Sequence, residues 1–100
     1  MSRNTDLVHL GLILLADWLK PMRLSPYALA KAIDVRTRRI NGIVKGQRGI
    51  SIDTALRLGA FFSTDAESWV NLQTHYDAER ARASLRETLA RIPRYRANAV

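Results

Sequence analysis

Residues 24–46 carry the feature that most restricts the fold, namely two short helical segments separated by a tight turn. Ser25 and Pro26 begin the first segment, because a serine side chain caps a helix N-terminus and proline suits the first helical position. Asp34 suits the turn, since aspartate tolerates the left-handed backbone conformation. The pattern predicts a pair of short helices around which the rest of the chain is organised.

The second segment of this pair, residues 36–44, has an apolar side and a polar side. At 3.6 residues per turn Ile40, Ile43 and Val44 share one arc, while Arg38 and Asn41 lie roughly opposite, together with Gly42 and Lys45. This is the pattern of a helix-turn-helix, whose second helix enters the DNA major groove. Arginine can bind guanine and asparagine can bind adenine through paired hydrogen bonds.

Every charged residue between Asp34 and Asp53 is positive, which favours contact with phosphates. A solvated basic helix face followed by an ordinary basic loop is the alternative interpretation. The loop at residues 45–49 holds two glycines, and Gly46 is placed to end the second helix. The candidate DNA-binding residues are Arg36, Thr37, Arg38, Arg39, Asn41, Lys45 and Arg48.

The overall composition is that of one globular domain with an acidic partner. The chain has 100 residues, of which 47% are hydrophobic, and a net charge of +7. It has no cysteine, so disulfides and thiolate metal sites are excluded, and we expect neither metal nor cofactor. The apolar run at residues 10–15 is too short to span a membrane, so we expect a cytoplasmic protein without membrane contact.

Helical patterns fill the rest of the chain and predict an all-α fold. Residues 7–19 form a first helix that Pro21 ends, with a core-facing stripe at Leu12, Leu15, Ala16 and Leu19. Ser51 caps a fourth helix. Thr64 and Glu67 have the spacing of a capping box and open a fifth. Residues 77–91 have a helix-forming composition, and Pro93 ends them.

The fifth helix and the region beyond it suggest a division of the chain. Trp69, Leu72 and Tyr76 line one side of the fifth helix, where they either pack in the core or form a dimer interface. Leucines further on are out of register with these three residues, so we expect a bend or a separate helix near Asp77. The predicted division is residues 1–76, a DNA-binding domain with a dimerising fifth helix, and residues 77–100, a basic helical extension.

Two segments resemble a known family. GISIDTALRLGAFF at residues 49–62 and ESWVNLQTHYD at residues 67–77 are similar to the HigA-type antitoxins, which belong to the XRE-like, or lambda-repressor-like, helix-turn-helix group. The resemblance covers residues 10–77, including Gly11 and Leu14. It implies a compact five-helix bundle, here with a C-terminal helical extension. Asp34 stands where the wider group often has glycine.

The resemblance implies a function as well as a fold. Such proteins are dimers that bind operator DNA upstream of their own operon, repress it, and neutralise a HigB-type toxin, an mRNA-cleaving ribonuclease of the RelE-like superfamily. Carried over by position, Thr37, Arg38, Asn41 and Lys45 would meet double-stranded DNA. No toxin-contact residue carries over.

Two other functions are weighed against this one. The first is a stand-alone XRE-like transcriptional regulator with no toxin partner. The second is a small basic ribonuclease that uses His75 and Asp77. Residues two apart on a helix do not face each other, and no paired general acid and base is evident. We therefore expect a DNA-binding protein and not an enzyme.

Overall fold

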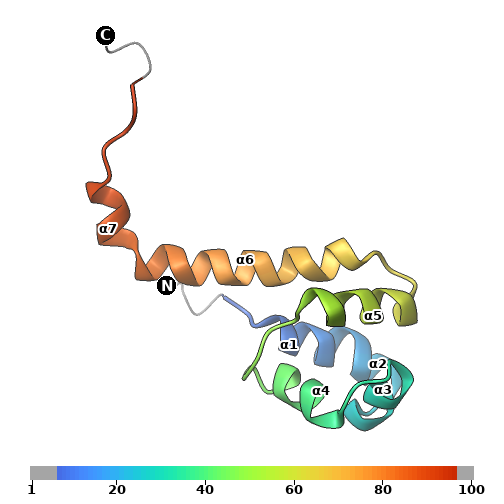
Figure 1. Ribbon diagram of the computed structural model, residues 1–100. Coiled ribbons are helices and arrows are strands. Elements are labelled where there is room, and N and C mark those ends of the chain that lie inside the picture. Colours follow the sequence, from blue (N-terminus) through green and yellow to red (C-terminus); the bar gives the residue numbers. More distant parts are fainter. Residues whose placement is uncertain (1–6, 97–100) are drawn as a thin grey trace.

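The computed structural model describes residues 7–96, and every regular element in that range is helical, which confirms the all-α prediction (Figure 1). The first three elements run on as one rod, so residues 10–84 form the five expected helices and α7 forms the extension. The elements are α1 (Leu10–Ile13), η2 (Leu14–Leu19), α2 (Lys20–Met22), α3 (Pro26–Ala32), α4 (Thr37–Val44), α5 (Ile52–Phe62), α6 (Ala66–Ser84) and α7 (Arg86–Arg91).

The first rod contains a π-helical turn, η2, and continues through Pro21, so the prediction that Pro21 ends it was wrong. The Lys20 N–H donates to the Leu15 carbonyl, five residues back instead of four. A wider turn fits a proline, which lacks an N–H and clashes with the carbonyl four residues before it in a regular α-helix. The rod ends at Arg23, which adopts the left-handed conformation at φ 55°.

The π turn also changes which side of the rod faces the core. Leu10, Leu14 and Leu19 are buried, whereas Leu12 is 52% exposed and Ala16 is exposed as well, so the predicted stripe was wrong at those two positions. The five-residue step from Leu14 to Leu19 matches the wider turn. A stripe counted at 3.6 residues per turn therefore loses its register within this segment.

The helix-turn-helix forms as the sequence predicts. The Ser25 hydroxyl accepts the Ala28 N–H at 3.0 Å and caps α3. Asp34 makes the turn at φ 61°, and α4 follows from Thr37. Gly46 ends α4 at φ 75°, with its N–H donating to the Ile43 carbonyl at 3.0 Å.

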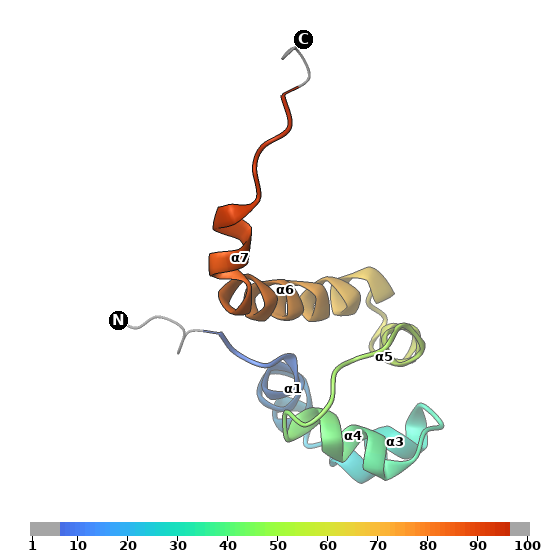
Figure 2. The same ribbon diagram turned by 60° about the vertical axis from the view of Figure 1, so that its left-hand side comes forward.

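Helices α5 and α6 pack against each other, and α6 lies on the side of the bundle away from α3 and α4 (Figures 1 and 2). Ser51 caps α5, as predicted. Helix α6 is capped by Asp65, whose carboxylate accepts the Ser68 N–H at 2.8 Å, so the prediction of a cap at Thr64 was wrong. The Thr64 hydroxyl instead accepts the Trp69 indole N–H at 2.9 Å.

Trp69 lies inside the core with only 2% of its surface exposed. Its ring packs 5.5 Å from that of Trp18, which in turn lies 4.7 Å from the ring of Phe62. A side chain covered by its own chain is not available to a second copy, so its assignment to a dimer interface was wrong. Leu72 and Tyr76 pack against the same core but remain partly exposed.

Helix α6 runs unbroken through Asp77 to Ser84, so the prediction of a bend or a separate helix near Asp77 was wrong. The bend lies at Leu85, where α7 turns away (Figure 2). The predicted boundary at residues 76–77 is therefore in the middle of a helix, although the side chains of residues 81–96 are exposed. Within residues 7–96, no helix has both the length and the apolar character that crossing a membrane requires.

Candidate nucleic-acid interface

Helix α4 presents the polar face that the sequence predicts. Ile40 and Ile43 are fully buried against the core. Arg38 and Lys45 are exposed on the other side, and Asn41 is half-buried between them. The polar residues of this side line one open groove with two residues of the loop that follows α4. The groove is lined by Arg38, Asn41, Gly42, Lys45, Gln47 and Arg48. Side chains suited to base edges therefore share one exposed surface.

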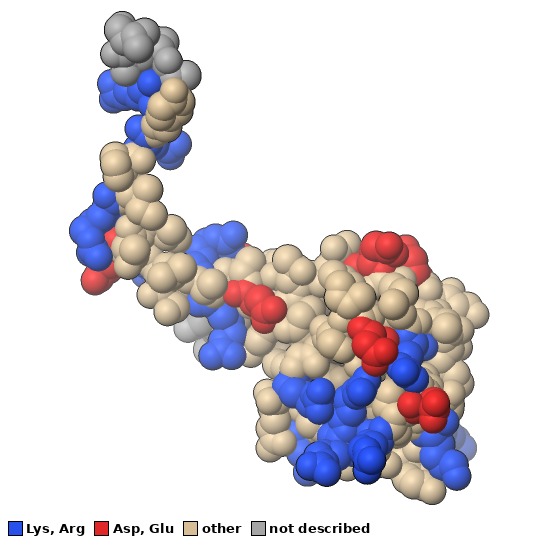
Figure 3. All heavy atoms as spheres, in the orientation of Figure 1, with Lys and Arg blue, Asp and Glu red and all other residues tan. Residues whose placement is uncertain are grey.

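Cations gather around this face and at the N-terminal end of α4. Figure 3 shows Lys and Arg side chains concentrated over the part of the molecule where Figure 1 places α4. Arg36, Arg38, Arg39 and Arg48 line a second hollow beside the turn at Asp34. The N-terminal end of a helix also carries partial positive charge. The predicted cationic residues thus lie together at one end of the bundle, and this arrangement favours an anionic ligand.

The structure explains why a glycine occupies position 42 inside α4, which the sequence left open. A Cβ atom at this position would lie 2.8 Å from Cδ of Arg48. The glycine therefore makes room for the Arg48 side chain to cross α4 from the following loop. The close neighbour is a residue of the same chain's loop, and it keeps Arg48 beside Asn41 in the groove.

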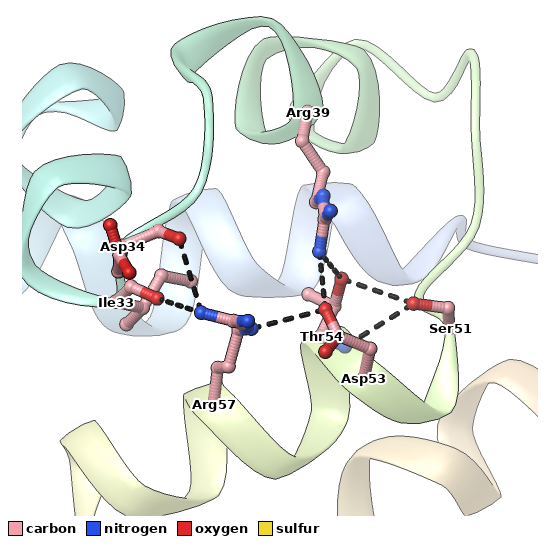
Figure 4. Close-up of polar contacts among 7 residues, drawn as sticks. All are labelled: Ile33, Asp34, Arg39, Ser51, Asp53, Thr54 and Arg57. Atoms are coloured by element: carbon pink, nitrogen blue, oxygen red, sulfur yellow. Dashed lines mark hydrogen bonds and ion pairs between the residues drawn. The ribbon is translucent and has the colours of Figure 1, made fainter.

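Arg39 differs from the other candidate DNA-binding residues because α5 holds its guanidinium. Its Nη1 donates to Asp53 Oδ2 at 2.6 Å and to the Thr54 hydroxyl at 3.2 Å (Figure 4). The side chain is 31% exposed, against 54% for Asp53. Hydrogen bonds from Arg39 and then from Arg57 lower the pKa of Asp53, so this carboxylate keeps its charge to a lower pH than a free aspartate does.

Arg57 completes this cluster, whereas the sequence left open whether this residue is partly buried or faces DNA. Its Nε donates to Asp53 Oδ2 at 3.0 Å. Its Nη1 donates to the Ile33 and Asp34 carbonyls at 2.8 and 3.1 Å, within the turn of the helix-turn-helix (Figure 4). The four-residue spacing of Asp53 and Arg57 indicates an ion pair on a helix. No local pattern indicates that this pair reaches the turn.

His9 connects the N-terminal rod to α6. Its Nδ1 accepts the Gly11 N–H at 2.8 Å and so caps α1. Its ring meets that of Tyr76 edge to face at 4.8 Å. Burial and the nearby charge of Arg80 lower the pKa of His9, and Asp77 opposes this effect. These contacts give His9 a structural role between the N-terminal rod and α6.

The residues considered for a ribonuclease do not form an acid–base pair. Asp77 accepts a hydrogen bond from the Gln73 side-chain amide at 2.9 Å, and Gln73 accepts the Ile50 N–H at 2.6 Å. Asp77 and Gln73 thus connect α6 to the loop before α5. This contact is structural, and it does not involve His75.

A helix-turn-helix with an exposed, cationic second helix defines the class of DNA-binding domains. No protein-family model matches the chain. Virulence-associated protein I of Dichelobacter nodosus is 57% identical over 74 residues, which cover 74% of this chain and 68% of that protein.

Two solved antitoxin structures show the same fold. Pseudomonas aeruginosa antitoxin HigA with the higBA promoter is 41% identical with a TM-score of 0.83, and the match covers 86% of this chain and 95% of that one. Antitoxin GraA in complex with its operator is 37% identical with a TM-score of 0.83, covering 90% and 92% of the two chains. The chain belongs to the HigA family of helix-turn-helix antitoxins. Both of these solved structures are of antitoxins together with promoter or operator DNA.

Proposed function

We propose that this protein, as a dimer, binds operator DNA upstream of its own operon and represses transcription. The observation that carries this proposal is the polar face of α4, where Arg38, Asn41 and Lys45 line one open groove and could hydrogen-bond to base edges. Arg36 and Arg48 line the adjoining hollow and would bind phosphates beside this face. Antitoxin structures that contain promoter or operator DNA support the same interpretation.

Two copies are needed because one short helix contacts few base pairs. Two copies would bind half-sites about 34 Å apart, one turn of the double helix. Of the predicted interface, Leu72 and Tyr76 on α6 remain partly exposed and remain the proposed dimer contact. The second proposed activity is neutralisation of a HigB-type toxin, and family membership alone supports it.

Substitution of Arg38 tests the DNA-binding half. If Arg38 binds a guanine through paired hydrogen bonds, Arg38→Ala should cost about 1–3 kcal/mol on the operator and relax specificity at one base pair. Gel shifts with the DNA upstream of the operon and with random duplexes measure both effects. Arg86→Ala is a matched control, because it removes the same charge from the exposed surface of α7. An equal loss on all sequences would reduce Arg38 to a phosphate contact.

Co-expression tests the antitoxin half. We expect the adjacent gene to arrest growth when it is expressed alone, and we expect this chain to restore growth. Failure of rescue, with upstream DNA still bound, would leave the stand-alone regulator as the function. An adjacent gene that is harmless when expressed alone would support the same alternative.

A further inference from the structure

One carboxylate oxygen connects the DNA-facing helix to the rest of the bundle. Asp53 Oδ2 accepts hydrogen bonds from Arg39 on α4 at 2.6 Å and from Arg57 on α5 at 3.0 Å (Figure 4). The Arg57 guanidinium also holds two carbonyls of the turn that leads into α4. The first turn of α4 and the residues before it are therefore fastened to the same helix by three adjoining side chains, which we call the clamp: Arg39, Asp53 and Arg57.

The ion pairs of the clamp are too exposed to contribute much to the free energy of unfolding. Its ion pairs are one-third to one-half exposed, and pairs of that kind add little to the free energy of unfolding. Its geometry is the notable property, because it acts where the angle of α4 is set. Base contacts require hydrogen-bonding groups to be placed within fractions of an ångström, so a small rotation of α4 is enough to weaken them.

The clamp also determines what Arg39 can do. Arg39 lines the same hollow as Arg36, Arg38 and Arg48, so a released guanidinium would join a phosphate-binding surface. A phosphate contact adds affinity for any DNA sequence and steepens the dependence of binding on salt. Asp53 therefore both orients α4 and withholds one cation from DNA.

We propose that Asp53 and Arg57 are positioning residues that give the protein its discrimination between operator and random DNA, without touching DNA themselves. This inference rests on the proposed function of α4 as the DNA-reading helix. It predicts that, when Asp53 loses its charge, affinity for the operator falls while affinity for random DNA holds or rises. A residue needed only for folding would weaken binding to both kinds together.

The main test is Asp53→Asn, which keeps the shape of the side chain and removes its charge. Asp65→Asn is the matched control, because it changes net charge equally and asparagine is an equally good helix cap. Arg57→Lys is a second variant that keeps the charge but loses the fork of donors. Binding to a duplex from upstream DNA and to a random duplex is measured well below each melting temperature.

For Asp53→Asn we expect operator affinity to fall about tenfold, which is the size of one good base contact. Affinity for random DNA should hold or rise, with a salt slope steeper by about 0.9, one added phosphate contact. Arg57→Lys should lose operator affinity alone. Operator-to-random ratios within twofold of wild type in both variants, or parallel losses on both DNAs, would overturn the proposal.

A DNA-free measurement separates this proposal from the proposed function. Amide hydrogen exchange at residues 41–44, inside α4, should rise several-fold in Asp53→Asn and stay unchanged in Asp65→Asn. Unchanged exchange there would overturn the clamp even if the wild type binds its operator. If exchange is faster in Asp53→Asn but the wild-type protein does not bind the upstream DNA, the role of the clamp is supported and the proposed function is rejected.

Discussion

Replacing Gly11 by alanine should separate α1 from the C-terminal end of α4. A Cβ atom at Gly11 would lie 2.6 Å from the carbonyl carbon of Ile43 and closer still to its oxygen. Real Cβ atoms do not approach backbone so closely, and a backbone carbonyl cannot rotate away as a side chain can. The two helices would have to move apart, which would disturb the packing of Leu10 and Leu14.

The expected cost follows from the neighbour that must move. Overpacking a core costs about 1–3 kcal/mol, and a clash with rigid backbone belongs at the upper end. Alanine returns at most about 1 kcal/mol through its better helix propensity. A net loss of about 2 kcal/mol lowers the melting temperature of a domain this size by roughly 8–16 °C.

Gly42→Ala is the matched control for Gly11→Ala, because it makes the same substitution inside a helix. Its Cβ would meet only the side chain of Arg48, at Cδ and Cγ, and this exposed side chain can rotate away, so the melting temperature should hold or rise slightly. Thermal unfolding followed by circular dichroism measures both variants. A Gly11→Ala protein that melts within about 4 °C of wild type would refute the close approach of α1 to α4.

Two further predictions concern His9 and Asp65. Because the pKa of His9 is below its ordinary value of 6.5, the unfolded chain binds more protons, so the free energy of unfolding should fall as the pH drops below 6.5. His9→Asn should flatten this part of a denaturant-derived stability profile, and an unchanged profile would assign the dependence elsewhere. Asp65→Ala should cost about 1 kcal/mol, measured by thermal unfolding, because α6 loses its cap. If Glu67→Ala lowers the stability and Asp65→Ala does not, the capping box predicted at Thr64 would be correct after all.

The sequence by itself determined the features that depend on near neighbours. Ser25 and Ser51 cap helices through N–H groups three residues away, and Asp34 and Gly46 adopt the left-handed conformation that their residue types favour. The outward face of α4 followed from its apolar side, since burial of Ile40 leaves Arg38 exposed and Asn41 half-buried on the other side. Such interactions operate within one or two turns, so the order of residues is enough to predict them.

Tertiary structure alone decided the rest. Arg57 reaches carbonyls 23 and 24 residues away, and Arg39 finds its partner 14 residues along the chain, on a different helix. Trp69 is covered by residues of the N-terminal rod and α5, so its aromatic surface is used inside the protein. These partners meet only when whole helices pack. That packing depends on many small gains in free energy from burying apolar side chains, and it cannot be inferred from the spacing of residues within a single segment.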